Sequence, residues 1–410
     1  MVKTVDNPQS ILVIGPAWVG DMVMAQALFK ALRERHGEVA IDVVAPAWSG
    51  PLLARMPEVR ETIELPVAHG ELGLRTRWRI ARSLRQKCYD QAIVLPRSAK
   101  AALLPWFAGI PVRTGYRGEH RYAMLNDIRP LDEASVYRTV DRYVGLALPR
   151  GEAMLQPQNR SRTEAGNDTD QPSASTDLVP VSRVPNPRLT STLEQQATAI
   201  RALGLDKPRQ PAADQPGDRG IRPLARQATD EDNTDKPVLS LCPGAEYGPA
   251  KRWPAAYFAA LARAYLDKGW RVWLIGSAND QPIAAQITQQ APSVEDLTGQ
   301  TELAQAIDLL AASRAVVTND SGLMHVAAAT GTPLVALYGS SDPQYTPPLS
   351  DQARILYRGL SCSPCFEREC PLEHLDCLRG ITPTEVSDAL ATIIGVDTPY
   401  HPHSQGRTTQ

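Results

Sequence analysis

The chain has 410 residues, 21% of them charged, a formal net charge of −2 at pH 7 and six cysteines. This balance gives no global signal for nucleic-acid binding, and so few cysteines do not make a secreted disulfide scaffold. The longest apolar run, near residues 11–14, is too short to span a bilayer, and no signal peptide is recognisable, so we expect a cytoplasmic protein. The length predicts two domains.

Strands and helices alternate through the first part of the chain. Apolar runs predict strands at residues 10–15, 40–45 and 91–95, and helical spacing predicts helices at 21–35 and 75–87. Such alternation is typical of a parallel sheet. We therefore predict a doubly wound domain at residues 1–148.

The middle of the chain, residues 149–236, is poor in apolar residues. Residues 159–182 and 208–235 are rich in polar residues and proline, so we expect both to be disordered. Between them, residues 189–205 have the spacing of one short amphipathic helix. We interpret residues 149–236 as a low-complexity insert.

The α/β alternation resumes after the insert. Strands are predicted at residues 238–241, 271–275, 315–318 and 333–337, and helices at 255–267, 302–312, 323–329 and 384–394. This predicts a second doubly wound domain at residues 237–395, followed by a flexible tail at 396–410. If the two domains face each other, the carboxyl ends of their strands line the cleft between them.

Asp21 stands where the first strand passes into the first helix. A carboxylate there can act as a general base towards a ligand in the cleft, or it can simply cap the helix. The loop at residues 15–21 lacks the Gly-x-Gly-x-x-Gly spacing of a dinucleotide fold. Nicotinamide chemistry is therefore disfavoured.

Two loops of the second half carry charged residues after a strand. The loop at residues 243–254 brings Lys251 and Arg252 to the expected cleft, where they can balance a diphosphate or remain ordinary surface cations. The next loop carries Asp280, which can accept hydrogen bonds from ribose hydroxyls or cap the following helix.

The turn at residues 319–322 joins a buried strand to an alanine-rich helix. The first amides of a helix lack partners and its dipole is positive there, so the turn is suited to a phosphate, and Gly322 allows close approach. The alternative is that Asp320 or Ser321 is only an N-cap. His325, one turn into the helix, can reach the same ligand or be a packed residue.

Positive charge is concentrated between residues 71 and 150. This stretch has fifteen Lys or Arg and seven Asp or Glu on a nearly neutral chain, which indicates an anionic ligand and contact with an anionic membrane surface without insertion. The alternative is a solvated basic face. The candidates for binding such a ligand, which is the acceptor in the family discussed below, lie in predicted cleft loops and are Arg97, Lys100, Arg117 and Arg121.

Four cysteines lie close together near the end of the second half. Cys362, Cys365, Cys370 and Cys377 supply enough soft ligands for a tetrahedral zinc ion, although their spacing matches standard zinc modules only in part. Reduced thiols or a local disulfide are the alternatives.

Four motifs in order resemble those of the ADP-heptose:lipopolysaccharide heptosyltransferases of glycosyltransferase family nine, in their II branch. The motifs are IGPAWVGD at residues 14–21, APAW at 45–48, PGAEYGPAKRWP at 243–254 and NDSGLMH at 319–325. The resemblance implies a GT-B fold of two Rossmann-like domains, with the acceptor on the first and the nucleotide sugar on the second. It also implies inverting transfer of L-glycero-D-manno-heptose from ADP-heptose to the first heptose of the lipid A-core acceptor. No cofactor is required by this chemistry, and dependence on a divalent ion is left open.

The same resemblance assigns the site residues. Asp21 is the expected base. Glu246 and Tyr247 differ from the threonines of the I branch, which favours the II branch. Heptosyltransferase I, another core heptosyltransferase, a nucleotide-sugar epimerase and a non-catalytic nucleotide-sugar binding protein are the alternatives. The donor-contact positions are Glu246, Tyr247, Lys251, Asp280, Thr301, Asp320, Ser321, Gly322 and His325.

Overall fold

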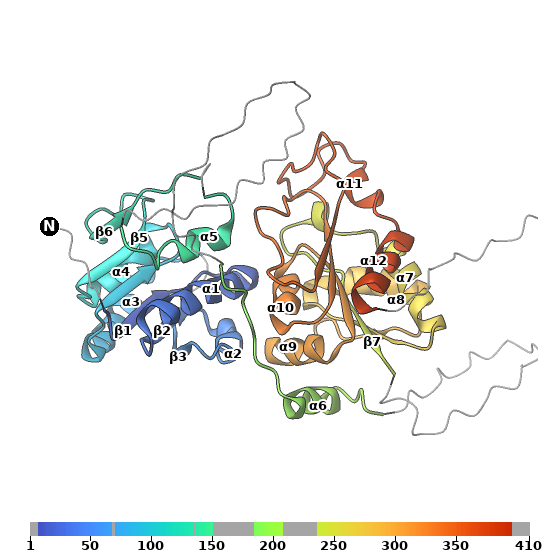
Figure 1. Cartoon of the computed structure of the whole chain (residues 1–410), viewed down its shortest axis with the longest axis horizontal. Helices are drawn as coiled ribbons and strands as arrows, with labels where there is room; N and C mark the ends of the chain where they lie inside the picture. Colours follow the sequence, from blue (N-terminus) through green and yellow to red (C-terminus); the bar gives the residue numbers. More distant parts are fainter. Residues whose placement is uncertain (1–6, 68–69, 134–135, 151–183, 208–235, 396–410) are drawn as a thin grey trace, which may run out of the picture. The chain divides into compact units, whose positions relative to one another are not determined.

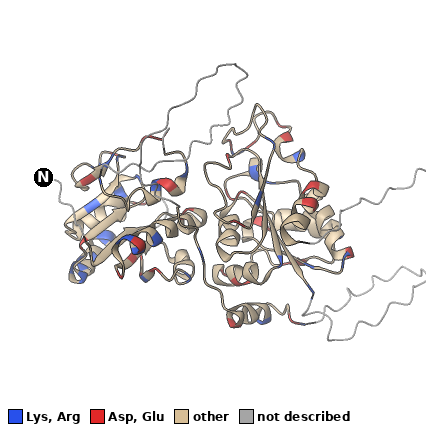
Figure 2. Cartoon of the chain, in the orientation of Figure 1, with Lys and Arg blue, Asp and Glu red and all other residues tan. Residues whose placement is uncertain are grey.

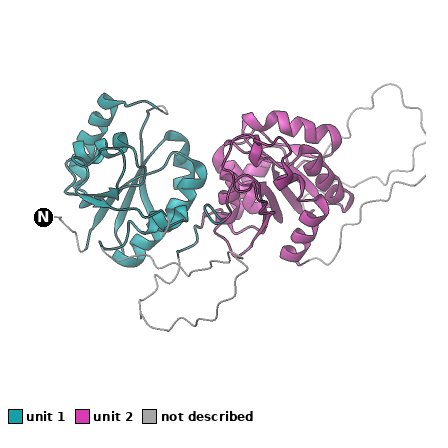
Figure 3. Cartoon of the chain, turned by 90° about the horizontal axis from the view of Figure 1, so that it is seen from above, with its two compact units in different colours: residues 1–187, 344–347 teal, residues 188–343, 348–410 magenta. Residues whose placement is uncertain are grey.

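The computed structural model describes residues 7–67, 70–133, 136–150, 184–207 and 236–395. The chain divides into two compact units (Figure 3). Unit 1 contains Met1–Pro187 and Gln344–Pro347, and unit 2 contains Arg188–Pro343 and Pro348–Gln410. Within the described ranges, no helix combines the length and the apolar character that a membrane crossing requires.

Unit 1 is built on a six-stranded parallel sheet with the order β3-β2-β1-β4-β5-β6. Its elements, shown in Figure 1, are β1 (Ser10–Ile14), α1 (Val19–His36), β2 (Ala40–Ala45), η1 (Ala47–Ser49), α2 (Gly50–Leu53), β3 (Val59–Glu64), α3 (Leu74–Leu84), η2 (Arg85–Lys87), β4 (Gln91–Val94), α4 (Ala99–Phe107), β5 (Val112–Tyr116), β6 (Asp127–Arg129) and α5 (Thr139–Val144).

The central strands of unit 1 are apolar on both sides, as expected for a parallel sheet covered by helices. Leu12 and Ile14 share a buried cluster with residues of α3 and α4. Ile11 and Val13, which point to the opposite face, are equally inaccessible to solvent. The helices α1 and α5 pack together, as do α3 and α4.

Unit 2 repeats this plan with the order β12-β11-β10-β7-β8-β9, again parallel at each pairing. Its elements are α6 (Leu193–Ala202), β7 (Val238–Cys242), η3 (Pro249–Lys251), α7 (Ala255–Asp267), β8 (Arg271–Leu274), η4 (Ala278–Asp280), α8 (Gln281–Gln290), β9 (Glu295–Asp296), α9 (Leu303–Ala312), β10 (Ala315–Asn319), α10 (Gly322–Thr330), β11 (Leu334–Tyr338), β12 (Ala353–Tyr357), α11 (Asp376–Arg379) and α12 (Pro383–Ile394).

Aromatic residues dominate one side of the unit 2 core. Trp253 is fully buried and makes edge-to-face contacts with Tyr257 and Phe258, at centroid distances of 5.5 and 4.9 Å. Its indole nitrogen donates to the carbonyl of Ile381, 2.8 Å away. Because Trp253 directly follows the loop that carries Lys251, this packing fixes one end of that loop.

The short helix predicted within residues 189–205 is present as α6 and packs against α9. The chain before it is attached to unit 2, since Leu189 N donates to Ala329 O at 2.9 Å and Ser191 Oγ contacts the Asp308 carboxylate at 2.7 Å. The segments predicted to be disordered, 159–182 and 208–235, and the tail at 396–410 lie outside the described residues.

Candidate active site

The two sheets have equivalent topological switch points. In unit 1 the strands β1 and β4 are neighbours whose following connections diverge, and in unit 2 the same holds for β7 and β10. Ligands of open α/β sheets bind beyond the carboxyl ends of the strands at such points. Asp21 and Arg97 follow β1 and β4, and Lys251 and Asp320 follow β7 and β10.

Asp21 lies in the first turn of α1, whose N-cap residue is Trp18. The interpretation of Asp21 as the cap is therefore wrong. The residue is partly exposed, but its carboxyl group is largely buried, and this burial raises the pKa of Asp21 to about 6. A carboxylate with that pKa is ionised at neutral pH and is a stronger base than an ordinary aspartate.

Tyr143, on α5, is the partner of Asp21 that the sequence did not reveal. Its side chain hydrogen-bonds the Asp21 carboxylate, which partly opposes the effect of burial on the pKa of Asp21. Burial and the nearby negative charge of Asp21 raise the pKa of Tyr143 well above its usual value, so the phenol stays protonated and donates. The α5 backbone is fixed by Thr139 N, which donates to Tyr345 O at 3.0 Å.

In unit 2, Asn319 joins the two loops at the switch point. Its Oδ1 accepts from Trp253 N at 3.0 Å, and its Nδ2 donates to Pro243 O at 2.7 Å. The side chain is inaccessible to solvent, so these bonds are made in a low-dielectric interior where leaving them unmade is costly. Asn319 therefore holds the two ends of the 243–254 loop against β10.

Lys251 and Asp320 form a partly buried ion pair at this point. Lys251 Nζ lies 2.6 Å from Asp320 Oδ2, which also accepts from Ser341 Oγ at 2.5 Å. Asp320 is only 5% exposed. The ammonium group also lies 4.9 Å from the centroid of the Tyr247 ring, a cation–π distance. The structure thus brings together Lys251, Asp320 and Tyr247, three of the residues that the resemblance assigns to donor contacts.

The N-terminus of α10 faces the same loops. Its N-cap residue is Ser321, whose side chain makes no capping hydrogen bond. The N-cap explanation offered for Asp320 is wrong, because its carboxylate contacts Lys251 and Ser341 instead. An uncapped helix start that begins at Gly322 retains the amides and the positive dipole end that an anion needs.

His325 lies one turn into α10 and is 5% exposed. Burial lowers the pKa of His325 to about 4, while the charge of Asp320 acts in the opposite direction and that of Lys251 in the same one. The imidazole is therefore neutral at physiological pH. It can offer a hydrogen bond to a ligand but adds no positive charge.

Asp280 stands at the N-cap position of α8, but its side chain makes no capping hydrogen bond to that helix, and it belongs instead to the capping box of η4. Its Oδ2 accepts from both the backbone N and the Oγ of Ser277, each at 2.9 Å. A Cβ added at Gly244 would stand 2.3 Å from this carboxyl group. Glycine is thus required at position 244 because Asp280 packs directly on the backbone that follows β7.

The two remaining donor candidates are less enclosed. Glu246 is exposed and accepts from Asn279 Nδ2 at 3.3 Å. Thr301 is partly buried just before α9. Tyr247 is 41% exposed, and its hydroxyl donates to Phe366 O, so its ring is held beside Lys251 by a distant segment.

The acceptor candidates of unit 1 differ in exposure. Arg97 pairs with Glu133 at 2.5 Å, Arg117 Nε donates to Tyr122 Oη at 3.0 Å, and Lys100 is partly buried. Arg121 is only 1% exposed and donates to the carbonyls of Pro96 and Tyr116.

Burial also lowers the pKa of Arg121 to about 10. Because its guanidinium group donates to Pro96 O and Tyr116 O, Arg121 supports the loops after β4 and β5 from inside unit 1. Arg97 and Arg117 lie on those loops.

Two doubly wound parallel units, the second with an uncapped helix start beside a partly buried lysine, have the GT-B architecture of glycosyltransferases, as in the similar solved structure given below. The family model for glycosyltransferase family 9 (heptosyltransferase) matches residues 77–376. Lipopolysaccharide heptosyltransferase 2 of Escherichia coli K12 is 44% identical over 94% of this chain and 98% of its own. Lipooligosaccharide heptosyltransferase 2 of Haemophilus influenzae is 43% identical over 85% and 88%.

A solved structure, that of E. coli ADP-heptose LPS heptosyltransferase II, superposes with a TM-score of 0.73 at 38% identity and covers 94% of this chain and 98% of that one. The chain belongs to glycosyltransferase family 9, the heptosyltransferases.

Proposed function

We propose that the chain transfers L-glycero-D-manno-heptose from ADP-heptose to the first heptose of the lipopolysaccharide inner core, with inversion at the anomeric carbon. The observation that carries this proposal is the similarity to heptosyltransferase 2 along nearly the whole of both chains. The placement of charged residues at both switch points supports it, because a donor and an acceptor each need a site of their own.

In the proposed step, Asp21 takes the proton of the acceptor hydroxyl as that oxygen attacks the anomeric carbon. The bond from this carbon to the diphosphate oxygen breaks, and ADP leaves from the opposite face. Tyr143 is a positioning residue, because it orients the carboxylate and sets its basicity. The raised pKa of Asp21 makes proton transfer more favourable while leaving the group ionised at neutral pH.

The donor is held by unit 2. Lys251 and the amides of Ser321 and Gly322 balance the charge that develops on the departing diphosphate, so they stabilise the transition state more than the bound donor. Neutral His325 and Asp320 contact the donor near this end, with Glu246 and Tyr247 beside Lys251. Asp280 and Thr301 lie towards the nucleoside. Protein groups supply the countercharge, and the reaction needs no cofactor.

The test is a transfer assay with ADP-heptose against lipid A-core acceptors that carry zero, one or two heptoses. We expect efficient transfer to the acceptor with one heptose, and kcat/KM lower by at least about 100-fold for the other two, since a missing or extra sugar misplaces the attacking hydroxyl. Product mass and ADP release report the reaction. A preference for the acceptor without heptose would assign the chain to heptosyltransferase I activity instead.

A basic and aromatic face on α3 supports contact with an anionic membrane. Arg75, Arg79 and Arg82 are exposed and recur at helical spacing, and Trp78, 53% exposed, lies within 5.7 Å of the Arg82 guanidinium. Figure 2 shows this helix among the basic segments of unit 1. We propose that this face rests on the cytoplasmic leaflet of the inner membrane, where the lipid acceptor is embedded.

Reversing these charges in Arg75→Glu/Arg79→Glu/Arg82→Glu should raise the KM for the membrane-embedded acceptor at least about tenfold, because each cation near an anionic surface contributes on the order of 1 kcal/mol. Steady-state kinetics with acceptor in anionic vesicles measures this, and ADP-heptose binding should not change. Arg201→Glu, on α6, is the matched control. An unchanged acceptor KM in the triple variant would contradict the membrane contact.

A further inference from the structure

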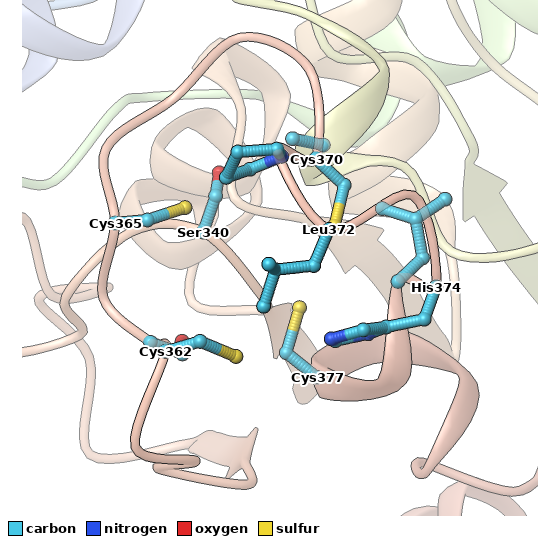
Figure 4. Close-up of a pocket in the computed structure, with 11 residues that line it drawn as sticks. Ser340, Cys362, Cys365, Cys370, Leu372, His374 and Cys377 are labelled. Atoms are coloured by element: carbon cyan, nitrogen blue, oxygen red, sulfur yellow. The ribbon is translucent and has the colours of Figure 1, made fainter.

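Four of the six cysteines line one pocket of unit 2, shown in Figure 4: Cys362, Cys365 and Cys370 lie between β12 and α11, and Cys377 lies in the first turn of α11. We propose that the thiolates of Cys362, Cys365, Cys370 and Cys377 together bind one soft divalent transition-metal ion, zinc or iron. Tetrahedral four-sulfur coordination suits these ions and takes up all four ligands, as in a structural site. The proposal concerns the stability of unit 2 and does not depend on which sugar is transferred.

The four thiols line the same pocket, with Cys377 buried and Cys362, Cys365 and Cys370 partly buried. Cysteine binds a metal ion as the thiolate, and a divalent ion balances the negative charge of the deprotonated sulfurs.

A buried hydroxyl in the same pocket provides an independent indication of a ligand. Ser340 is 1% exposed and lines the pocket, yet its Oγ has no hydrogen-bond partner. Buried hydroxyls are normally satisfied, because an unmade bond costs the desolvation of the group. A hydroxyl in this place can donate to a metal-bound thiolate sulfur, as outer-sphere donors of metal sites do. Figure 4 shows Ser340 beside Cys365.

The segment also has an unusual concentration of left-handed backbone conformations. Phe366, Glu373 and Leu375 have φ values of 57, 58 and 54°, and they are three of the five non-glycine residues with positive φ in the described part of the chain. Such conformations are unfavourable for residues with a Cβ and persist only where the surroundings fix them. Residues 358–375 contain no helix or strand. A metal cross-link among the cysteines would add to the hydrogen bonds that hold Phe366 and Leu375.

All four cysteines are free thiols in this structure. Across the described ranges, no three His, Cys, Asp or Glu side chains already stand in ligand geometry. Each cysteine can turn about its Cα–Cβ bond, and the proposal requires the four sulfurs to turn towards the pocket that they line. His374 is the less suitable fourth ligand, because its Nδ1 accepts from Asp376 N at 2.9 Å at the start of α11.

The segment supports the loop that carries Lys251. Arg368 O accepts from Ala250 N at 3.0 Å, and Phe366 N donates to Ser340 O at 2.7 Å. A Cβ at Gly248 would stand 2.4 Å from Arg368 O, so the two segments are in close contact. Loss of the metal should therefore raise the KM for ADP-heptose. This kinetic effect rests on the proposed function, whereas the metal content of the chain can be measured independently of it.

The test is metal analysis of the full chain, purified with a reducing agent and without chelators. We expect about one equivalent of zinc or iron per chain and, after exchange with Co²⁺, thiolate-to-cobalt charge-transfer absorption. Cys362→Ser/Cys365→Ser should lose at least about nine-tenths of the metal, whereas Cys88→Ser, on exposed Cys88 of unit 1, should retain it.

Three results would overturn the proposal. These are metal well below stoichiometry after incubation with Zn²⁺ or Co²⁺, metal retained by the double serine variant, or a mass deficit that shows a disulfide among the four cysteines. If the double variant does not fold, titration of the wild-type chain with a mercurial decides the question. Thiol modification should then release about one metal ion for each chain as the cobalt absorption disappears.

Discussion

Asp21→Asn is expected to lower the rate of heptose transfer at least about 100-fold, because the amide cannot accept the proton of the attacking hydroxyl. Asparagine keeps the size of the side chain and an oxygen that can accept from Tyr143. The affinity for ADP-heptose, measured by calorimetry, should change by less than about twofold, since the proposed donor contacts are on unit 2. A loss of donor affinity that matched the loss of rate would contradict this division of roles.

The same variant should be more stable than the wild-type chain at neutral pH. Burial raises the pKa of Asp21 from 3.8 to about 6, so the folded state binds more protons than the unfolded state between these values. Stability contributed at Asp21 therefore falls as the pH rises through this window. Asparagine does not ionise, so the variant avoids the cost of a buried carboxylate. Its free energy of unfolding at pH 8 should exceed that of the wild-type chain by roughly 1–3 kcal/mol, with no gain below pH 4.

The pH dependence of kcat/KM distinguishes an Asp21 that acts as the general base from an Asp21 that has only a structural role. The acidic limb of kcat/KM should fall near the pKa of Asp21, about 6, because only the ionised carboxylate accepts a proton. Tyr143→Phe removes the hydrogen bond that lowers this pKa, so the limb should move to higher pH while the rate at pH 8 changes little. Tyr122→Phe, on an exposed residue of the same unit, should leave the limb in place.

Lys251→Ala should lower kcat/KM by about 100- to 1,000-fold, as the loss of one group that stabilises transition-state charge does elsewhere. Removing Lys251 also leaves the carboxylate of Asp320, 5% exposed, without its cation. Removing one partner of a buried ion pair lowers the free energy of unfolding by about 3–5 kcal/mol. We expect a loss at the lower end of this range, because the side chain of Lys251 is 16% exposed.

A double variant separates the contribution of Lys251 to folding stability from its contribution to heptose transfer. Lys251→Met/Asp320→Asn removes both charges, so the unfolding midpoint should recover while transfer remains low. Arg252→Ala is the neighbouring control, because Arg252 donates only to Ala245 O, at 3.2 and 3.3 Å, among the bonds described. Recovery of transfer in the double variant would show that Lys251 acts only on the fold.

The central strands and the helices after them were predictable because their residues are apolar in a periodic pattern. β2 (Ala40–Ala45) and α7 (Ala255–Asp267) have the predicted bounds. Short edge elements were missed for a physical reason. β3 has three exposed charged residues among its six and no fully buried residue, and β6 has three residues, so neither has an apolar run to recognise. The inclusion of Gln344–Pro347 in unit 1 is set by tertiary contacts that no local pattern records.

The site was predictable to the extent that it lies in strand-to-helix loops. The pairing of Lys251 with Asp320 follows from the sheet order, because β7 and β10 are neighbours. Tyr143 and Ser341 were not foreseen, because each reaches its carboxylate from another element and has no motif of its own. The burial of Arg121 was also missed, since a count of basic residues does not distinguish a solvated guanidinium from one that supports loops.

On the proposed mechanism, Asp21 is the base for the transfer of heptose from ADP-heptose to a core acceptor that carries one heptose. Single-turnover transfer by wild-type chain and Asp21→Asn, with both prepared in parallel and saturated with donor, tests it most directly. We expect one heptose added and one ADP released by the wild-type chain, and a rate at least about 100-fold lower in the variant at equal donor occupancy. A wild-type rate in Asp21→Asn would contradict the mechanism.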